Sequence, residues 1–199
     1  MKELYPQHYA MTLLGFVIGA RPSTLRPLRR SGPTPDVLWD ERLVLLRRSH
    51  TMGTEIMDRT KTKRDLEIPL PAPVMEALRE HVAQLDGAMA TSDYLFPSLT
   101  GGLRASTVLG KPFAEVVSAL GWKMRFTPLG MRRTFNDLAR GASVPDLVTR
   151  AISGYATEEM QHHYSTAQRE EVRGAVESIM ASLTGAANDT ALEKKDEEK

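Results

Sequence analysis

The chain has 199 residues, of which 41% are hydrophobic and 26% charged, and its formal net charge at pH 7 is +1. These values fit one domain with a single buried core. The sequence contains no cysteine, which excludes disulfides and thiolate metal sites, so we expect an intracellular, cytoplasmic protein. The early apolar run at residues 13–20 is too short to cross a bilayer, which takes ~20 residues.

The first predicted elements are helices. Residues 6–19 place Leu13, Phe16 and Val17 on one helical face. A second helix is expected to begin at Pro22, because proline suits the first turn of a helix. The proline-containing stretch at residues 31–35 then opens a loop.

Strand-like segments follow at residues 43–46, 54–57 and 66–70, the last with alternating Leu66, Ile68 and Leu70. A turn signal at residues 52–53 and a charged segment at residues 58–64 separate them. This pattern predicts a small antiparallel three-stranded sheet and argues against alternating strands and helices.

Helices dominate the rest of the chain. Apolar spacing predicts them at about residues 71–85, 106–120, 129–140, 144–152, 158–164 and 169–183. After Gly185 the chain is small and charged, which predicts disorder. The expected fold class is therefore α+β, mainly α, with one domain at residues 1–184 and a disordered charged tail at residues 185–199.

Charge is distributed unevenly along the chain. Residues 21–64 contain eleven Lys/Arg against five Asp/Glu, a local balance of +6, whereas the segment from Gly185 onward has a balance of −2. A basic face of this kind is suited to phosphate-backbone contacts. A solvated, salt-bridged surface would give the same pattern, and charge alone does not separate the two interpretations.

Gly19-Ala20-Arg21 stands at the end of the first predicted helix, so that Arg21 opens the next one. An arginine in this position can present its planar fork of donors to a phosphate. By itself the motif is weak, because most such arginines are ordinary surface residues.

The segment 61–71 combines a basic tip, Lys61-Thr62-Lys63-Arg64, with an alternating strand and a proline-started helix. A lysine at a hairpin tip can reach a neighbouring active site and protonate a leaving oxygen. A charged turn is the plainer interpretation.

Arg132 follows Leu129-Gly130-Met131 in the first turn of a predicted helix. The helix dipole disfavours a cation in this position, so an arginine held there for a bound phosphate is easier to explain than a purely structural one.

Two tyrosines close the set, Tyr155 after Ser153-Gly154 and Tyr164 nine residues later. A tyrosine hydroxyl can attack a phosphodiester and form a covalent phosphotyrosine. A buried core tyrosine is the commoner role for a single residue of this kind.

In this order the motifs resemble the tyrosine recombinase (phage integrase) family over roughly residues 5–183. The family pattern is a Gly-x-Arg box, a hairpin lysine, a His-x-x-Arg box, a Gly-His or Gly-Trp, and a tyrosine nine residues after that His or Trp. The matching positions are Arg21, Lys61 (or Lys63), Arg132, Tyr155 and Tyr164. The stretch Leu95-Phe96-Pro97-Ser98 also resembles a frequent family segment.

The resemblance implies a helical catalytic domain that acts as a site-specific DNA recombinase or integrase of a mobile element, through a 3′-phosphotyrosine intermediate. It implies no metal or other cofactor, double-stranded DNA as partner, a homo-multimer on DNA, no membrane, and a nucleoid location if the source is prokaryotic. The implied catalytic residues are Arg21, Lys61, Arg132, Tyr155 and Tyr164, and the implied DNA-binding residues are Arg21, Lys61, Lys63, Arg64, Arg132 and Arg133.

Three positions depart from the family pattern. Leu129 replaces the histidine of the His-x-x-Arg box, Tyr155 stands at the His/Trp position, and Thr24 replaces a frequent acidic residue. Leucine can neither donate nor accept a hydrogen bond, so one phosphate or proton-transfer contact is lost. Few residues precede the first helix, whereas family members usually carry an N-terminal helical domain, so the chain resembles the catalytic half alone.

Two alternatives remain open. A degenerate recombinase that binds DNA or a partner recombinase without cutting is favoured by Leu129 and Tyr155. The other alternative is a plain helical domain in which the motifs occur by chance. DNA binding that weakens with rising salt would argue against it.

Overall fold

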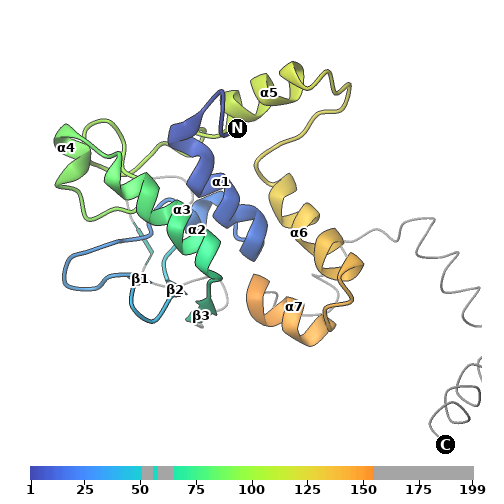
Figure 1. The fold of residues 1–199 in the computed structure, drawn as a ribbon, viewed down its shortest axis with the longest axis horizontal. Coiled ribbons are helices and arrows are strands. Elements are labelled where there is room, and N and C mark those ends of the chain that lie inside the picture. The colour runs from blue at the N-terminus through green and yellow to red at the C-terminus, as the bar shows by residue number, and fades with distance from the viewer. Residues whose placement is uncertain (51–55, 58–64, 155–199) are drawn as a thin grey trace, which may run out of the picture. The chain divides into compact units, whose positions relative to one another are not determined.

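The computed structural model describes residues 1–50, 56–57 and 65–154, all within one compact unit (Figure 1). The predicted helices at 158–164 and 169–183 and the predicted tail at 185–199 lie outside the described residues. In chain order the elements are α1 (Pro6–Ile18), α2 (Pro22–Leu25), β1 (Val37–Leu38), β2 (Leu43–Leu46), β3 (Leu66–Pro69), α3 (Ala72–Ala83), α4 (Gly87–Ala90), α5 (Gly110–Ala119), α6 (Gly130–Gly141) and α7 (Asp146–Ser153).

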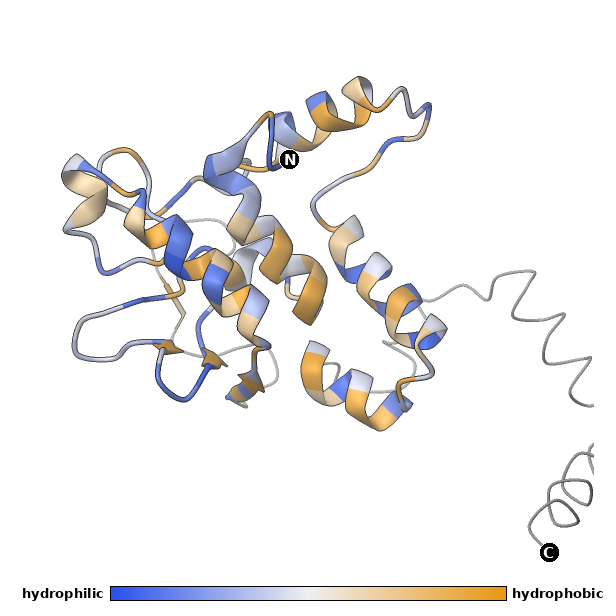
Figure 2. Cartoon of the chain, viewed as in Figure 1, coloured by the Kyte–Doolittle hydropathy of each residue, from blue (hydrophilic) through white to orange (hydrophobic). Residues whose placement is uncertain are grey.

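Helix α1 is the central helix of the core and contacts α2, α3 and α6. Its residues change from hydrophilic near Pro6 to hydrophobic toward Ile18 (Figure 2). Met11, Leu14 and Ile18 form its buried face. Leu13, Phe16 and Val17, the face that the sequence indicated, are only half-buried. The predicted helix at 6–19 is therefore confirmed to within one residue.

The sheet has the order β1-β2-β3, and both pairs of strands are antiparallel. Val44 pairs with Val37 on one side and with Ile68 on the other, and all three side chains are buried. The predicted sheet of three antiparallel strands is thus confirmed.

One member of the sheet differs from the prediction. The first strand is Val37–Leu38, whose two residues are too few to show an alternating pattern. Of the predicted strand at 54–57, only residues 56 and 57 are described, and Met57 pairs with Ser49 as an isolated bridge. Both backbone hydrogen bonds of this bridge are formed, at 3.0 and 2.9 Å.

Helix α5 lies against α1 through aromatic rings. The ring of Phe113 stacks on Phe16 at a centroid distance of 6.5 Å and on Phe126 at 5.7 Å. Stacked aromatic pairs of this kind add to the burial of the rings themselves. Among the described residues, no helix is long and apolar enough to span a membrane.

Gly19 is required where α1 ends. Its φ is +60°, and a Cβ at this position would lie 2.5 Å from Cδ1 of Phe135 on α6. We expect Gly19→Ala to lower the free energy of unfolding by about 1–3 kcal/mol, because left-handed strain and the clash add. Urea denaturation would measure the change.

The matched control is Gly141→Ala, at the end of α6, where the added Cβ meets no atom within 4 Å. This substitution should be neutral or stabilise by up to about 1 kcal/mol. Equal destabilisation by both substitutions would contradict the role assigned to Gly19.

Candidate functional site

Arg132 connects three segments that are far apart in the sequence. Its side chain is 2% exposed, and Nη1 donates hydrogen bonds of 2.8 Å to the carbonyl oxygens of Gly19 and Ser153. Gly19 ends α1, Arg132 lies in the first turn of α6, and Ser153 ends α7. The Gly-x-Arg box, the second arginine box and the residues that lead to Tyr155 therefore meet at one guanidinium.

The sequence of α6 explains how Arg132 reaches this position. Met131, Phe135 and Ala139 recur at a spacing of four residues and are buried, so this face turns toward the core. Helix α6 can approach α1 closely because residue 15 is glycine. A Cβ there would lie 2.7 Å from the sulfur of Met131.

Arg21 lies directly after the loop that Arg132 contacts. It is the N-terminal cap residue of α2, and its carbonyl accepts hydrogen bonds from the backbone N–H of Thr24 and Leu25 at 2.9 and 3.1 Å. Its side chain is half-buried. The two arginines predicted to bind phosphate thus lie on adjoining segments, and Arg132 holds the carbonyl two residues before Arg21.

The end of α7 packs against the strand that follows the predicted hairpin. Gly154 ends the helix with a φ of +69°, and a Cβ there would lie 2.6 Å from Cδ1 of Leu66 in β3. A glycine is therefore needed both for the turn and for the close approach to β3. Gly154, which precedes Tyr155, therefore lies close to Leu66, which follows the predicted hairpin lysines.

Five predicted site residues lie outside the described residues, so their placement stays a prediction: Lys61, Lys63, Arg64, Tyr155 and Tyr164. Asp65, directly after Arg64, and Gly154, directly before Tyr155, are the nearest described neighbours of these residues.

Leu129 and Arg133 flank the buried part of α6 on its solvent side. Leu129 precedes the helix, and 47% of its surface is exposed. Arg133 is exposed. Both side chains can therefore meet a macromolecule, but only Arg133 offers hydrogen-bond donors.

Several arginines of the basic region 21–64 are occupied by internal contacts. Asp36 is completely buried and accepts hydrogen bonds from Arg47 at 2.7 Å and from Arg48. Arg26 is 2% exposed and contacts His50 and the carbonyl of Arg104. The basic face is consequently smaller than the residue count suggests, because these cations stabilise the fold.

One of the described histidines also makes an internal contact. His81 is buried, and its Nε2 lies 3.1 Å from the carbonyl oxygen of Leu95. Burial, the nearby Arg104 and, to a smaller extent, Arg30 lower the pKa of His81 to about 4, while the contact with Leu95 acts in the opposite direction. Within the described ranges no group of three or more potential metal ligands occurs.

One cluster was not singled out by the sequence. His8 and Arg104 contact each other at 2.6 Å although 96 positions separate them. Neither residue belongs to a recognisable motif, and no local signal connects them.

Solved structures with a similar fold include those of two integrases and one recombinase. The Tn1549 transposon integrase in complex with transposon right-end DNA has a TM-score of 0.69 and 20% identity, over 90% of this chain and 60% of that chain. XerA recombinase has a TM-score of 0.68 and 18% identity, over 89% and 57%. A lambda integrase dimer bound to a COC′ core site has a TM-score of 0.57 and 15% identity, over 80% and 54%.

These similarities establish the fold. The helical domain with a small three-stranded antiparallel sheet is that of the tyrosine recombinase catalytic domain, as the motifs indicated. The chain spans 54–60% of the length of these three proteins. No protein-family model and no curated protein sequence matches the chain.

Proposed function

We propose that the chain is the catalytic domain of a site-specific DNA recombinase or integrase that cleaves and rejoins strands through a 3′-phosphotyrosine at Tyr164. The observation that carries the proposal is the contact of Arg132 with Gly19 and Ser153. A buried guanidinium at the meeting point of three predicted site segments is the arrangement that a phosphate clamp needs.

The chemistry follows from the residue types. Arg21 and Arg132 bind the non-bridging oxygens of the scissile phosphate and stabilise the charge that develops on them. The hydroxyl oxygen of Tyr164 loses its proton to water and attacks the phosphorus, a new oxygen–phosphorus bond forms, and the bond to the 5′-oxygen breaks. Lys61 gives its proton to that 5′-oxygen. Attack by another strand's 5′-hydroxyl reverses these steps, so the phosphodiester energy is conserved.

The remaining predicted residues act on the DNA backbone. Lys63, Arg64 and the exposed Arg133 bind neighbouring phosphates, which makes affinity fall with rising salt. Tyr155 supplies a hydroxyl to a phosphate oxygen or an aromatic wall beside it. The partner is double-stranded DNA. Exchange of strands between two duplexes requires several copies of the chain. These copies act at the nucleoid if the source is prokaryotic.

A nicked suicide duplex tests the proposal directly. The substrate is built from the DNA that flanks the chain's own gene, with a nick placed so that cleavage releases a short fragment and prevents religation. After incubation with the full chain, a protein–DNA adduct that resists SDS supports the proposed function. The contrary outcome is DNA binding without any adduct, observed also when an N-terminal domain is supplied. It would mean that the chain is a degenerate recombinase that binds DNA without cutting it.

Leu129→His restores the hydrogen-bonding side chain that the family pattern places before Arg132. Acid–base groups contribute about 10²–10⁴-fold to rate in mature sites. A histidine grafted without supporting contacts should recover only part of this, roughly tenfold in the rate of adduct formation. The measurement is the time course of adduct formation on the suicide duplex.

Leu138→His is the matched control, because Leu138 is also an exposed leucine of the α6 region, at 61% exposure. It should leave the rate unchanged. An equal gain from both substitutions would mean that added histidine charge, and not its place beside Arg132, changes the rate.

A further inference from the structure

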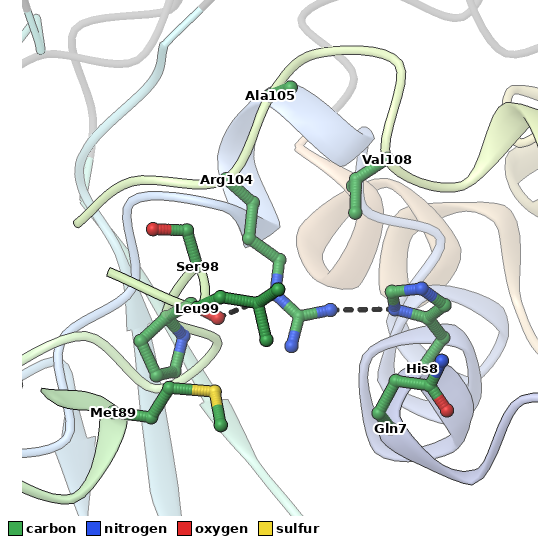
Figure 3. A pocket seen from close by; sticks show the side chains of 9 residues that line it. Gln7, His8, Met89, Ser98, Leu99, Arg104, Ala105 and Val108 are labelled. Atoms are coloured by element: carbon green, nitrogen blue, oxygen red, sulfur yellow. Dashed lines mark hydrogen bonds between the residues drawn. The ribbon is translucent and has the colours of Figure 1, made fainter. Parts of the chain in front are cut away.

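A cavity lies away from the candidate site, between the first turn of α1, α4 and the segment 97–108 (Figure 3). Its volume is about 340 Å³, which is in the range of small-molecule sites. The side chains of Met89, Leu99 and Val108 give it an apolar wall. Arg104 and His8 are its buried polar residues.

Arg104 has polar neighbours but no counter-charge. It is 7% exposed, its Nε donates to the carbonyl of Pro97 at 2.8 Å, and its Nη1 lies 2.6 Å from Nδ1 of His8. In the part of the chain that the structure describes, no carboxylate pairs with it, and its second terminal nitrogen has no hydrogen-bond partner. Figure 3 shows the guanidinium among the residues that line the cavity.

His8 does not compensate the positive charge of Arg104. Burial and, next, the charge of Arg104 lower the pKa of His8 to about 4, so the ring is neutral at pH 7. Its Nδ1 therefore accepts the hydrogen bond from Arg104. Burial also lowers the pKa of Arg104, as expected for a cation without a paired anion. A buried unpaired charge is costly, and an anion in the cavity would remove this cost.

We propose that this cavity, here called the anion pocket, binds a small organic carboxylate, with its oxygens on Arg104 and its short apolar body against Met89, Leu99 and Val108. An ionised carboxylate accepts a hydrogen bond from the second terminal nitrogen of Arg104 more strongly than a neutral acceptor does. The apolar wall favours a ligand with a hydrocarbon part over a bare inorganic anion.

The anion pocket is separate from the candidate catalytic residues. His8 lies in the first turn of α1 and Gly19 directly after its last turn, about 16 Å apart at the rise of an α-helix. Ligand binding here requires neither Tyr164 nor DNA. The proposal therefore stands or falls independently of strand cleavage.

Calorimetric titration of the full chain with hexanoate, hexanamide and inorganic phosphate tests the pocket. We expect saturable binding of hexanoate, at least about tenfold tighter than that of hexanamide, which has the same shape but no charge. Equal affinity for the two, or no binding of hexanoate, would overturn the proposal. Phosphate that binds as tightly as hexanoate would overturn it as well, because the apolar wall would then play no part.

Two variants place the binding in the cavity. Arg104→Met should abolish hexanoate binding, and Ala105→Trp should abolish it by filling the cavity from an exposed lining position while leaving Arg104 in place. The second variant decides the matter if the first does not fold. Arg125→Met, at an exposed arginine outside the cavity, is the control and should bind hexanoate like the parent.

A final arm separates a free ligand from DNA. A short duplex of unrelated sequence is added to the hexanoate complex at low salt. Unchanged hexanoate affinity supports a small-molecule site. Displacement of hexanoate by the duplex in the parent would show that a DNA phosphate occupies Arg104, and would replace the proposal with a DNA contact.

Discussion

Tyr164→Phe should abolish the SDS-resistant adduct with the nicked suicide duplex while leaving DNA affinity within about twofold of the parent. The substitution removes one hydroxyl oxygen, and without that nucleophile no covalent bond to phosphorus can form. Because the arginines and the ring remain, phosphate binding has no reason to change. Adduct yield on a denaturing gel and affinity by fluorescence anisotropy are the two measurements.

Tyr9→Phe is the matched control for this experiment. Tyr9 lies in α1, where Lys2 Nζ is 5.2 Å from the centroid of its ring, a contact that phenylalanine keeps. This variant should form the adduct like the parent. An adduct that survives in Tyr164→Phe would show that another nucleophile acts, and the assignment of Tyr164 would be wrong.

Arg132→Met is expected to have the second largest effect, on both stability and cleavage. It leaves the buried carbonyls of Gly19 and Ser153 without the donor that now bonds both, which should cost about 2–4 kcal/mol of unfolding free energy. Loss of a phosphate clamp should lower the cleavage rate by about 10²-fold or more. Urea denaturation and adduct kinetics, measured at a temperature where the variant is folded, separate the two effects.

Arg132→Lys and Arg133→Met complete the comparison. Lysine keeps the charge but lacks the planar fork, so cleavage should stay well below that of the parent while stability is partly recovered. Arg133 is exposed, and its substitution should change stability by no more than about 0.5 kcal/mol. Full activity in Arg132→Lys would show that a point charge suffices and that the two-carbonyl contact has no catalytic importance.

The periodic parts of the fold could be predicted from the sequence. The predicted helices at 6–19, 71–85, 129–140 and 144–152 correspond to α1, α3, α6 and α7, with ends shifted by one or two residues. Apolar spacing is a local property, so it predicts that these segments are helices. It did not identify the buried face of α1, because Met11, Leu14 and Ile18 are buried there. The expected Leu13, Phe16 and Val17 are only half-buried. The two-residue strand β1 could not be predicted, because two residues carry no period.

The candidate site was predicted from residue type and order. The fold brings together the part of it around Arg132. Arg132 was singled out as a phosphate ligand from its place in a first helical turn. Its bond to Gly19 spans 113 positions, and that to Ser153 spans 21. The sequence contains the residues at both ends of these contacts, but it does not show that folding brings them together.

Tertiary structure decided which charges are internal. Arg48 and Arg21 are the same residue type in the same basic region, but Arg48 is bound to the buried Asp36, whereas Arg21 is half-buried at the start of α2. Arg104 and His8 became neighbours only through packing across 96 positions. Local periodicity and motif order therefore determined the helices and the candidate chemistry of this protein. The partner of each buried charge depends on which distant segments the core brings together, and only the folded chain defines that.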